Sequence, residues 1–253
     1  MPNRRLTIIL AALSALAVSL AAAAGPPFFT DDPGIVPYGH YELYLFSTLD
    51  STSASTAVQA PAVEFNYGAA PNLMLHVVAP LAFASTPGGP TAFGPGDLEL
   101  GLNYRFYDNP GSGLQISTFP MLELPTGSAS RGLGNGRTWA RLPVWLEKDW
   151  GSWAVDTGGG LAVNHAPGQQ NYLFAGALLT RQLGEKWILG GELFTQGADS
   201  PDGRGFTIFN AGGFYNFRPG FSLLFTAGRS VAGEPHTVAY LGLYWTWGKS
   251  PGR

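Results

Sequence analysis

Hydrophobic and polar residues alternate one by one through most of the chain beyond residue 38. The clearest case runs from Asp97 to Phe106: the even positions are leucine or aromatic, and the odd positions are polar residues or glycine. Successive side chains of a β-strand point to opposite faces, so this segment would have one apolar face and one polar face. A helix would spread both sets around its circumference. The pattern therefore predicts a strand.

Segments of this kind repeat along the chain, and the third, eighth and ninth alternate least regularly. We place twelve strands at residues 39–49, 61–67, 73–82, 97–107, 113–124, 137–149, 153–164, 171–183, 187–196, 206–217, 221–230 and 237–247. A strand of about 11 residues, rising about 3.3 Å per residue and tilted by about 40°, is about 27 Å tall along the barrel axis. This height matches the apolar band of an outer-membrane barrel, which is about 25 Å tall.

The predicted connections differ in length from one end of the strands to the other. Every second connection is short, at residues 68–72, 108–112, 150–152, 184–186 and 218–220. The connections between them are mostly longer and rich in Gly, Pro and Ser, at residues 50–60, 84–96, 125–136 and 197–205. Short turns at one end and longer loops at the other are typical of outer-membrane barrels. The sequence therefore predicts an all-β fold, an antiparallel up-and-down transmembrane β-barrel of about twelve strands.

Composition argues against the main alternative, a soluble secreted β-sandwich, whose strands would also alternate. Charged residues make up only 12% of the chain, against about 25% in soluble domains. The formal net charge is −3 and no basic block is present, so nucleic acid is not an expected partner. Cysteine is absent, which excludes disulfides, thiol catalysis and thiolate metal sites.

The N-terminus has the features of a secretory signal peptide. Arg4 and Arg5 precede an apolar stretch over residues 6–20, and a run of alanines ends at Ala24. The alternative, an N-terminal membrane anchor, would need about 20 apolar residues. We therefore expect export to the bacterial outer membrane. The expected division is a signal peptide at 1–24, an N-terminal periplasmic or plug segment at 25–38, the barrel at 39–247 and a tail at 248–253.

The last predicted strand ends in the sequence Tyr-Leu-Gly-Leu-Tyr-Trp-Thr-Trp over residues 240–247. It resembles the closing-strand signal that the barrel-assembly machinery reads, with Gly242, Trp245 and Trp247 as the expected contacts. The tail at 248–253 departs from this signal, because such barrels usually end on the aromatic residue itself. Outer-membrane lipid and a small-molecule solute are the other expected partners.

Several short stretches resemble the family of exported barrels assigned to the MetA pathway of phenol degradation. They are GPPFFTDDP at 25–33, YGHYEL at 38–43, GPGDLEL at 94–100, LPTG at 124–127, GLGNG at 132–136, NHAP at 164–167 and ELF at 192–194. The resemblance covers nearly all of the chain after residue 24. It implies an outer-membrane barrel with a role in the uptake of aromatic or other apolar compounds, and it carries no catalytic motif.

The polar faces of the predicted strands carry most of the ionisable residues, which would therefore line the lumen. A lumen of this kind can tune the passage of solutes, or its ion pairs can merely stabilise the barrel, with Arg105, Arg137 and Arg141 facing the carboxylates. The lumen-lining candidates are Glu42, Glu64, His76, Asp97, Glu99, Arg105, Glu123, Arg141, Glu147, Asp156 and Glu192.

The proline-rich segment from Pro26 to Pro37 precedes the first strand and has two possible roles. It can fold into the lumen as a plug, because plugged lumens occur in this class, or it can be a flexible periplasmic lead-in. The plug candidates are Phe28, Phe29, Asp31 and Asp32. Two adjacent carboxylates lack the ligand count of a calcium site, so no metal and no cofactor are expected.

Function then divides between two classes. The leading hypothesis is a passive channel for small apolar or aromatic solutes, gated by the N-terminal segment and the loop at 125–136. The alternative is a closed structural or interaction barrel that acts through its extracellular loops. An enzyme is not expected: Asn164 and His165 form a candidate catalytic pair, but the sequence marks no serine nucleophile for them.

Overall fold

The computed structural model describes residues 26–248. The predicted signal peptide at 1–24 and all of the tail beyond Gly248 lie outside the described residues. Within the described part, no helix is long and apolar enough to cross a membrane. Its helical content is a single 3₁₀ turn, η1, over Ala129–Arg131.

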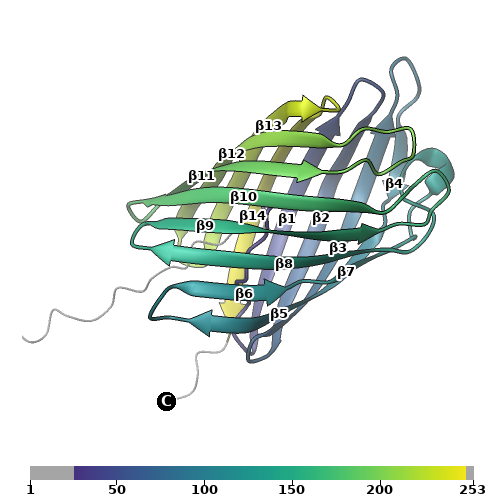
Figure 1. Cartoon of the computed structure of the whole chain (residues 1–253). Helices are drawn as coiled ribbons and strands as arrows, with labels where there is room; N and C mark the ends of the chain where they lie inside the picture. Colours follow the sequence, from purple (N-terminus) through teal and green to yellow (C-terminus); the bar gives the residue numbers. More distant parts are fainter. Residues whose placement is uncertain (1–25, 249–253) are drawn as a thin grey trace, which may run out of the picture.

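Twelve antiparallel strands close into a barrel, in which β14 pairs with β1 (Figure 1). One barrel strand consists of two pieces, β6 and β7, and β4 is a short addition beside β3. The strands are β1 (His40–Ser51), β2 (Thr56–Ala70), β3 (Leu73–Ser85), β4 (Ala92–Pro95), β5 (Leu98–Asn109), β6 (Leu114–Thr118), β7 (Met121–Leu124), β8 (Trp139–Trp150), β9 (Trp153–Val163), β10 (Tyr172–Leu183), β11 (Trp187–Gln196), β12 (Phe206–Arg218), β13 (Phe221–Gly233) and β14 (Thr237–Gly248). The fold class and the number of barrel strands predicted from the sequence are confirmed.

Two of the strands differ from their predicted bounds, and each contains or borders a proline. Residues 113–124 form two pieces that are interrupted at Phe119 and Pro120, because proline has no N–H for the ladder. The second strand begins at Thr56, earlier than expected, and contains Pro61. Its pairing with β3 shifts register between Gln59 and Ala62, and this irregularity accommodates the proline. The loop predicted at 50–60 is correspondingly shorter.

The alternation of side chains has the expected consequence for the two faces of the wall. On β5, Leu100, Leu102 and Tyr104 are exposed on the outside, whereas Glu99 and Asn103 are buried inside. Lipid-facing leucines and valines on most other strands follow the same rule. The wall therefore presents an apolar exterior and a largely polar interior, as a membrane barrel requires.

Aromatic side chains gather outside the barrel at the short-turn end. The ring of Tyr41 stacks on those of Tyr67 and Trp247, at centroid distances of 5.0 and 5.8 Å. Phe221 stacks in the same way on Trp245, at 5.1 Å. A belt of this kind suits the interface between lipid tails and water. The longer loops and η1 gather at the opposite end (Figure 1).

Candidate functional site: the barrel lumen

The N-terminal segment, residues 26–39, lies inside the barrel and is held there by Glu192 of β11. The carboxylate of Glu192 accepts the backbone N–H of Phe29 at 3.2 Å and that of Thr30. Asn210 of β12 donates its amide N–H to the same carboxylate at 3.2 Å. A fully buried carboxylate requires such donors, and here the segment supplies most of them.

Three other strands hold the segment at other points along its length. Thr226 of β13 donates its hydroxyl to the carbonyl of Pro27 at 2.8 Å. Asn103 of β5 donates its amide to the carbonyl of Gly34 at 3.1 Å. Near the start of β1, Gly39 donates its N–H to the carbonyl of Gly68 in β2, at 2.8 Å. The segment is thus fixed from the middle of the barrel to its short-turn end.

Two wall glycines leave the room that the segment occupies. A Cβ atom at Gly176 would lie 2.0 Å from the hydroxyl oxygen of Thr30. A Cβ atom at Gly68 would lie 2.2 Å from the carbonyl oxygen of Pro37. Glycine within a strand often marks the close approach of another backbone. The wall is therefore shaped to receive this segment.

Aromatic rings form a continuous row along one side of the lumen. Phe29 stacks on Phe194 at 5.2 Å, Phe194 on Phe174 at 6.2 Å, and Phe174 contacts Trp145 at 6.2 Å. These spacings are typical of favourable ring pairs. Phe28, the other predicted plug aromatic, is buried in a second apolar cluster with Tyr44 and Phe46. The row joins the segment to β11, β10 and β8.

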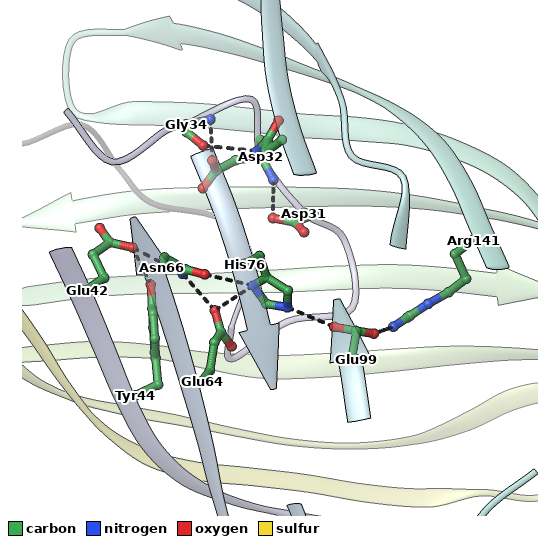
Figure 2. Close-up of polar contacts among 11 residues, drawn as sticks. Asp31, Asp32, Gly34, Glu42, Tyr44, Glu64, Asn66, His76, Glu99 and Arg141 are labelled. Carbon is green, nitrogen blue, oxygen red and sulfur yellow. Dashed lines mark hydrogen bonds and ion pairs between the residues drawn. The ribbon is translucent and has the colours of Figure 1, made fainter. Parts of the chain in front are cut away.

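A hydrogen-bonded polar network covers the facing wall, with His76 of β3 at its centre (Figure 2). The Nδ1 atom of His76 lies 2.7 Å from Asn66 Oδ1, and its Nε2 atom lies 2.9 Å from Glu99 Oε1. The amide of Asn66 donates to Glu64 at 2.9 Å, so its oxygen faces the histidine. Because both ring nitrogens face acceptors, this geometry suits a doubly protonated imidazolium.

Arg141 of β8 extends the network beyond Glu99, along neighbouring strands of the wall (Figure 2). Its guanidinium pairs with the second oxygen of Glu99 and lies 3.7 Å from Glu123 Oε1. At the other end, Glu42 accepts the hydroxyl hydrogens of Tyr244 at 2.6 Å and Tyr44 at 3.3 Å. The network therefore balances several carboxylates against two cationic groups and several neutral donors.

A separate polar chain lies towards the short-turn end. Arg105 donates to Gln115 Oε1 at 2.5 Å and forms an ion pair with Asp108 at 3.2 Å. Gln115 in turn donates to Glu147 at 2.7 Å. Asp156, directly opposite Glu147 in the β8–β9 register, is fully buried, and neither of its oxygens has a hydrogen-bond partner. This carboxyl group has no cationic neighbour of its own.

Cavities remain around the segment. One of about 640 Å³ is lined by Asp31, Asp32 and Phe194 as well as by His76. A second, of about 470 Å³, lies towards the long loops and is lined by Asn210, Thr226 and Tyr240. Phe28, Phe29 and Arg141 line both cavities, so the tip of the segment lies between them.

The loop between β7 and β8 folds over the mouth at the long-loop end. Asp97 accepts the backbone N–H groups of Gly127 at 2.9 Å and Asn135 at 2.6 Å. This contact places Leu133, which is only 4% exposed, against the second cavity. A smaller cavity of about 300 Å³ at the mouth is lined by Asp97 and by Asn164.

The predicted residues thus occupy different places in the barrel. Glu42, Glu64, His76, Glu99, Glu123 and Arg141 belong to the network; Arg105 and Glu147 belong to the short-turn chain; Glu192 holds the plug segment; and Asp97 holds the loop. Arg137 is exposed and, among the ion pairs of residues 26–248, takes no part. The expectation that it pairs with lumen carboxylates is wrong, because its side chain lies in the loop and not on the inner face of a strand.

The candidate pair Asn164–His165 has a different partner from the one that catalysis would need. Asn164 and Asn135 exchange two amide hydrogen bonds of 3.1 Å, which fasten the loop between β7 and β8.

Sequence reasoning missed Asn103, Thr226, Phe174 and Trp145. Each lies on the inner face of its strand, so alternation was the one signal that pointed to them.

Comparison with known proteins supports the fold. The sequence matches no family model and no curated protein. In structure, the chain is similar to the COG4313 outer membrane channel from Pseudomonas putida F1, with a TM-score of 0.72 and 17% identity, over 88% of this chain and 100% of that one. It is also similar to the KdgM porin in complex with disordered oligogalacturonate, with a TM-score of 0.55 and 10% identity, over 81% of this chain and 99% of that one.

A third structure shows that the same barrel architecture is not restricted to channels. The translocator domain of the autotransporter NalP from Neisseria meningitidis has a TM-score of 0.54 and 12% identity, over 81% of this chain and 88% of that domain. At these identities the similarities establish the outer-membrane barrel fold alone. The family resemblance predicted from short motifs stays a prediction.

Proposed function

We propose that this chain is an outer-membrane channel for the passive uptake of small, uncharged solutes of apolar or aromatic character. The observation that carries the proposal is the division of the lumen by the docked segment into cavities of about 640 and 470 Å³. Pockets for small molecules usually measure about 300–1,000 Å³. A barrel with a purely structural role has no need of such chambers.

The lining of the larger cavity favours uncharged aromatic solutes. The ring row of Phe29, Phe194, Phe174 and Trp145 offers flat apolar surfaces along its length. Most carboxylates on the facing wall already have partners, as Glu99 does between His76 and Arg141. A charged solute would have to compete with these contacts and would lose its own hydration. A neutral ring that slides along the row avoids both costs.

Two elements act as gates in this proposal. The N-terminal segment closes the lumen in its middle, and the loop that carries Leu133 covers the mouth. The solute would enter past the loop, occupy the cavity between the two gates and leave past the segment. Similarity to solved outer-membrane channels and porins supports a location in the outer membrane, with the long loops outside the cell.

The direct test is single-channel conductance of the refolded protein, lacking residues 1–24, in planar bilayers, with and without residues 25–37. The proposal predicts small or intermittent conductance with the segment and a larger, steady conductance without it. Uptake of benzyl alcohol and of a sugar of similar size by proteoliposomes should then favour the aromatic solute. Replacing Phe194 by alanine should reduce that preference, whereas replacing the lipid-facing Leu193 should not.

A closed barrel that acts through its outer loops is the second candidate. The number of contacts between the segment and the wall favours it, because Glu192, Thr226 and Asn103 hold the backbone at three points. The conductance experiment separates the two functions. If neither protein, with or without residues 25–37, conducts although circular dichroism shows that both are folded and inserted, the channel is excluded and the closed barrel is favoured.

A further inference from the structure

The least compensated charges of the described lumen lie where the N-terminal segment meets β8 and β9. Glu147 and Asp156 are directly opposite in the antiparallel register, and residues paired in this way point to the same face of the sheet. Both side chains are almost fully buried, and the two carboxyl groups interact with each other inside the barrel. Two carboxylates in contact cannot both stay ionised without a large electrostatic cost.

The hydrogen bonds around the pair show that Asp156 lacks a partner. Gln115 donates to Glu147, but no donor reaches either oxygen of Asp156. A buried carboxylate without donors or a cation is strongly unfavourable, as a buried ion is when its partner is removed. One proton shared between Glu147 and Asp156 removes this cost, because it supplies the hydrogen bond that the contact lacks. A single proton is therefore the ligand that fits the pair.

The segment adds its own carboxyl groups to this pair. Burial, followed by the charges of Glu147, Asp31 and Asp156, raises the pKa of Asp32 well above its ordinary value. The side chain of Asp32 is buried and accepts the backbone N–H of Gly34, a residue of the same segment. Because Asp32 leaves the cluster if the segment undocks, the number of protons bound differs between the docked and released states.

Most of the charged groups around the pair are carboxyl groups. Arg105 on β5 reaches Glu147 only through Gln115, while Leu178 of β10, opposite Asp156, is apolar. The titratable and charged groups that face the pair are Asp149 on β8, Asp31 and Asp32 on the segment, and Arg105 on β5. One guanidinium does not balance these carboxylates.

We propose that the docked N-terminal segment binds protons at the cluster of Asp32, Glu147 and Asp156, so that acidification fastens the segment in the lumen and a rise in pH loosens it. This inference deepens the proposed gating and rests on it. The sign follows from linkage: a carboxyl group whose pKa is raised by docking favours the docked state at low pH, and this preference is lost as the pH rises. Because burial and the charge of Glu147 raise the pKa of Asp32 well above its ordinary value of 3.8, the preference should begin to be lost as the pH rises past that value.

A spin label on the segment tests the proposal without any transport measurement. The chain has no cysteine, so Phe29→Cys, at a side chain 45% exposed within the lumen, gives a single labelling site. Electron paramagnetic resonance of the reconstituted protein in chelator should show an immobile label at pH 4.5 and a growing mobile fraction towards pH 8. The ratio of released to docked segment should rise by up to roughly tenfold per pH unit for each proton lost.

Substitutions in the wall identify the groups responsible. Asp156→Asn supplies an amide donor in place of the shared proton, so the label should stay immobile up to pH 8. Glu147→Gln should have the same effect and replaces Asp156→Asn if that variant does not fold. Glu185→Gln, at an exposed carboxylate in a short turn, should follow the unsubstituted protein.

Three outcomes would overturn the inference. They are a label whose mobility does not change between pH 4.5 and 8, an Asp156→Asn protein that titrates like the unsubstituted one, and immobilisation at pH 8 that appears only when calcium or magnesium is added. The last outcome would assign the cluster to a divalent cation. None of these outcomes would contradict the proposed channel function, because conductance after removal of residues 25–37 tests that function separately.

Discussion

The side chain of Glu192 accepts the backbone N–H of Thr30, a residue 162 positions earlier in the chain. This contact ties the N-terminal segment to the far wall of the barrel, and the adjacent N–H of Phe29 strengthens it. Hydrogen bonds to a charged group contribute about 1.5–3 kcal/mol each. Much of the free energy of docking should therefore depend on one carboxylate.

Replacing Glu192 by alanine should release the segment without unfolding the barrel. A loss of about 3 kcal/mol would raise the ratio of released to docked segment on the order of 100-fold, since 1.4 kcal/mol corresponds to tenfold. Single-channel recordings should then show long-lived open states. Leu193→Ala, a change on the lipid-facing side of the same strand, is the matched control. A folded Glu192→Ala barrel with unchanged gating would contradict the assigned role.

A disulfide between positions 30 and 176 should lock the segment in place. A Cβ atom at Gly176 would lie 3.1 Å from the Cβ atom of Thr30, close to the range of about 3.5–4.5 Å in disulfides. The double variant Thr30→Cys/Gly176→Cys should be silent when oxidised and should recover its openings on reduction. Each single-cysteine variant serves as a control that cannot form the link. Equal conductance in both redox states, with the bond shown by mass spectrometry, would mean that solutes pass around the segment.

Arg141→Met should destabilise the barrel by leaving Glu99 and Glu123 without their shared cation. Breaking a buried ion pair costs about 3–5 kcal/mol, and the cost should be nearer 2–3 kcal/mol here because the Arg141 side chain is 35% exposed. Urea unfolding from lipid vesicles measures the difference. Arg137→Met removes an exposed arginine without an ion pair among the described residues and should change stability little. Equal stability of the two variants would show that the network does not hold the wall together.

Asp97→Ala should loosen the loop over the mouth. The substitution removes both acceptors for the N–H groups of Gly127 and Asn135, so Leu133 should leave the second cavity more often. We expect uptake of small solutes to rise several-fold while the mobility of a label at position 29 is unchanged. Asp202→Asn, at an exposed loop residue, is the control. If the Asp97→Ala protein takes up solute at the rate of the unsubstituted protein, and only changes in the N-terminal segment alter uptake, the loop is not a gate.

The strands of the barrel wall and their two faces could be predicted from the sequence, because they depend on the pattern of neighbouring residues. In the segment around Leu100 and Asn103, alternation alone separates the lipid face from the lumen face, because each strand residue points opposite to its neighbour. The lengths of the connections likewise indicate which end carries the loops. The break at Pro120 is local chemistry too, since a missing N–H interrupts the ladder wherever the strand lies.

The contacts that these inner side chains make could not be predicted from the sequence. The sequence alone placed Glu192, Glu99 and Asp97 on the polar face, but their roles as a holder of the segment, a member of an ion-pair network and a holder of the loop depend on tertiary structure. Closing the barrel determines which strands face each other, and the register of every pair determines the height of each side chain. Local alternation encodes neither which strands face each other nor the height of each side chain. The sequence by itself therefore determined a membrane barrel and its inner face, while only the closed fold decided what the N-terminal segment meets inside.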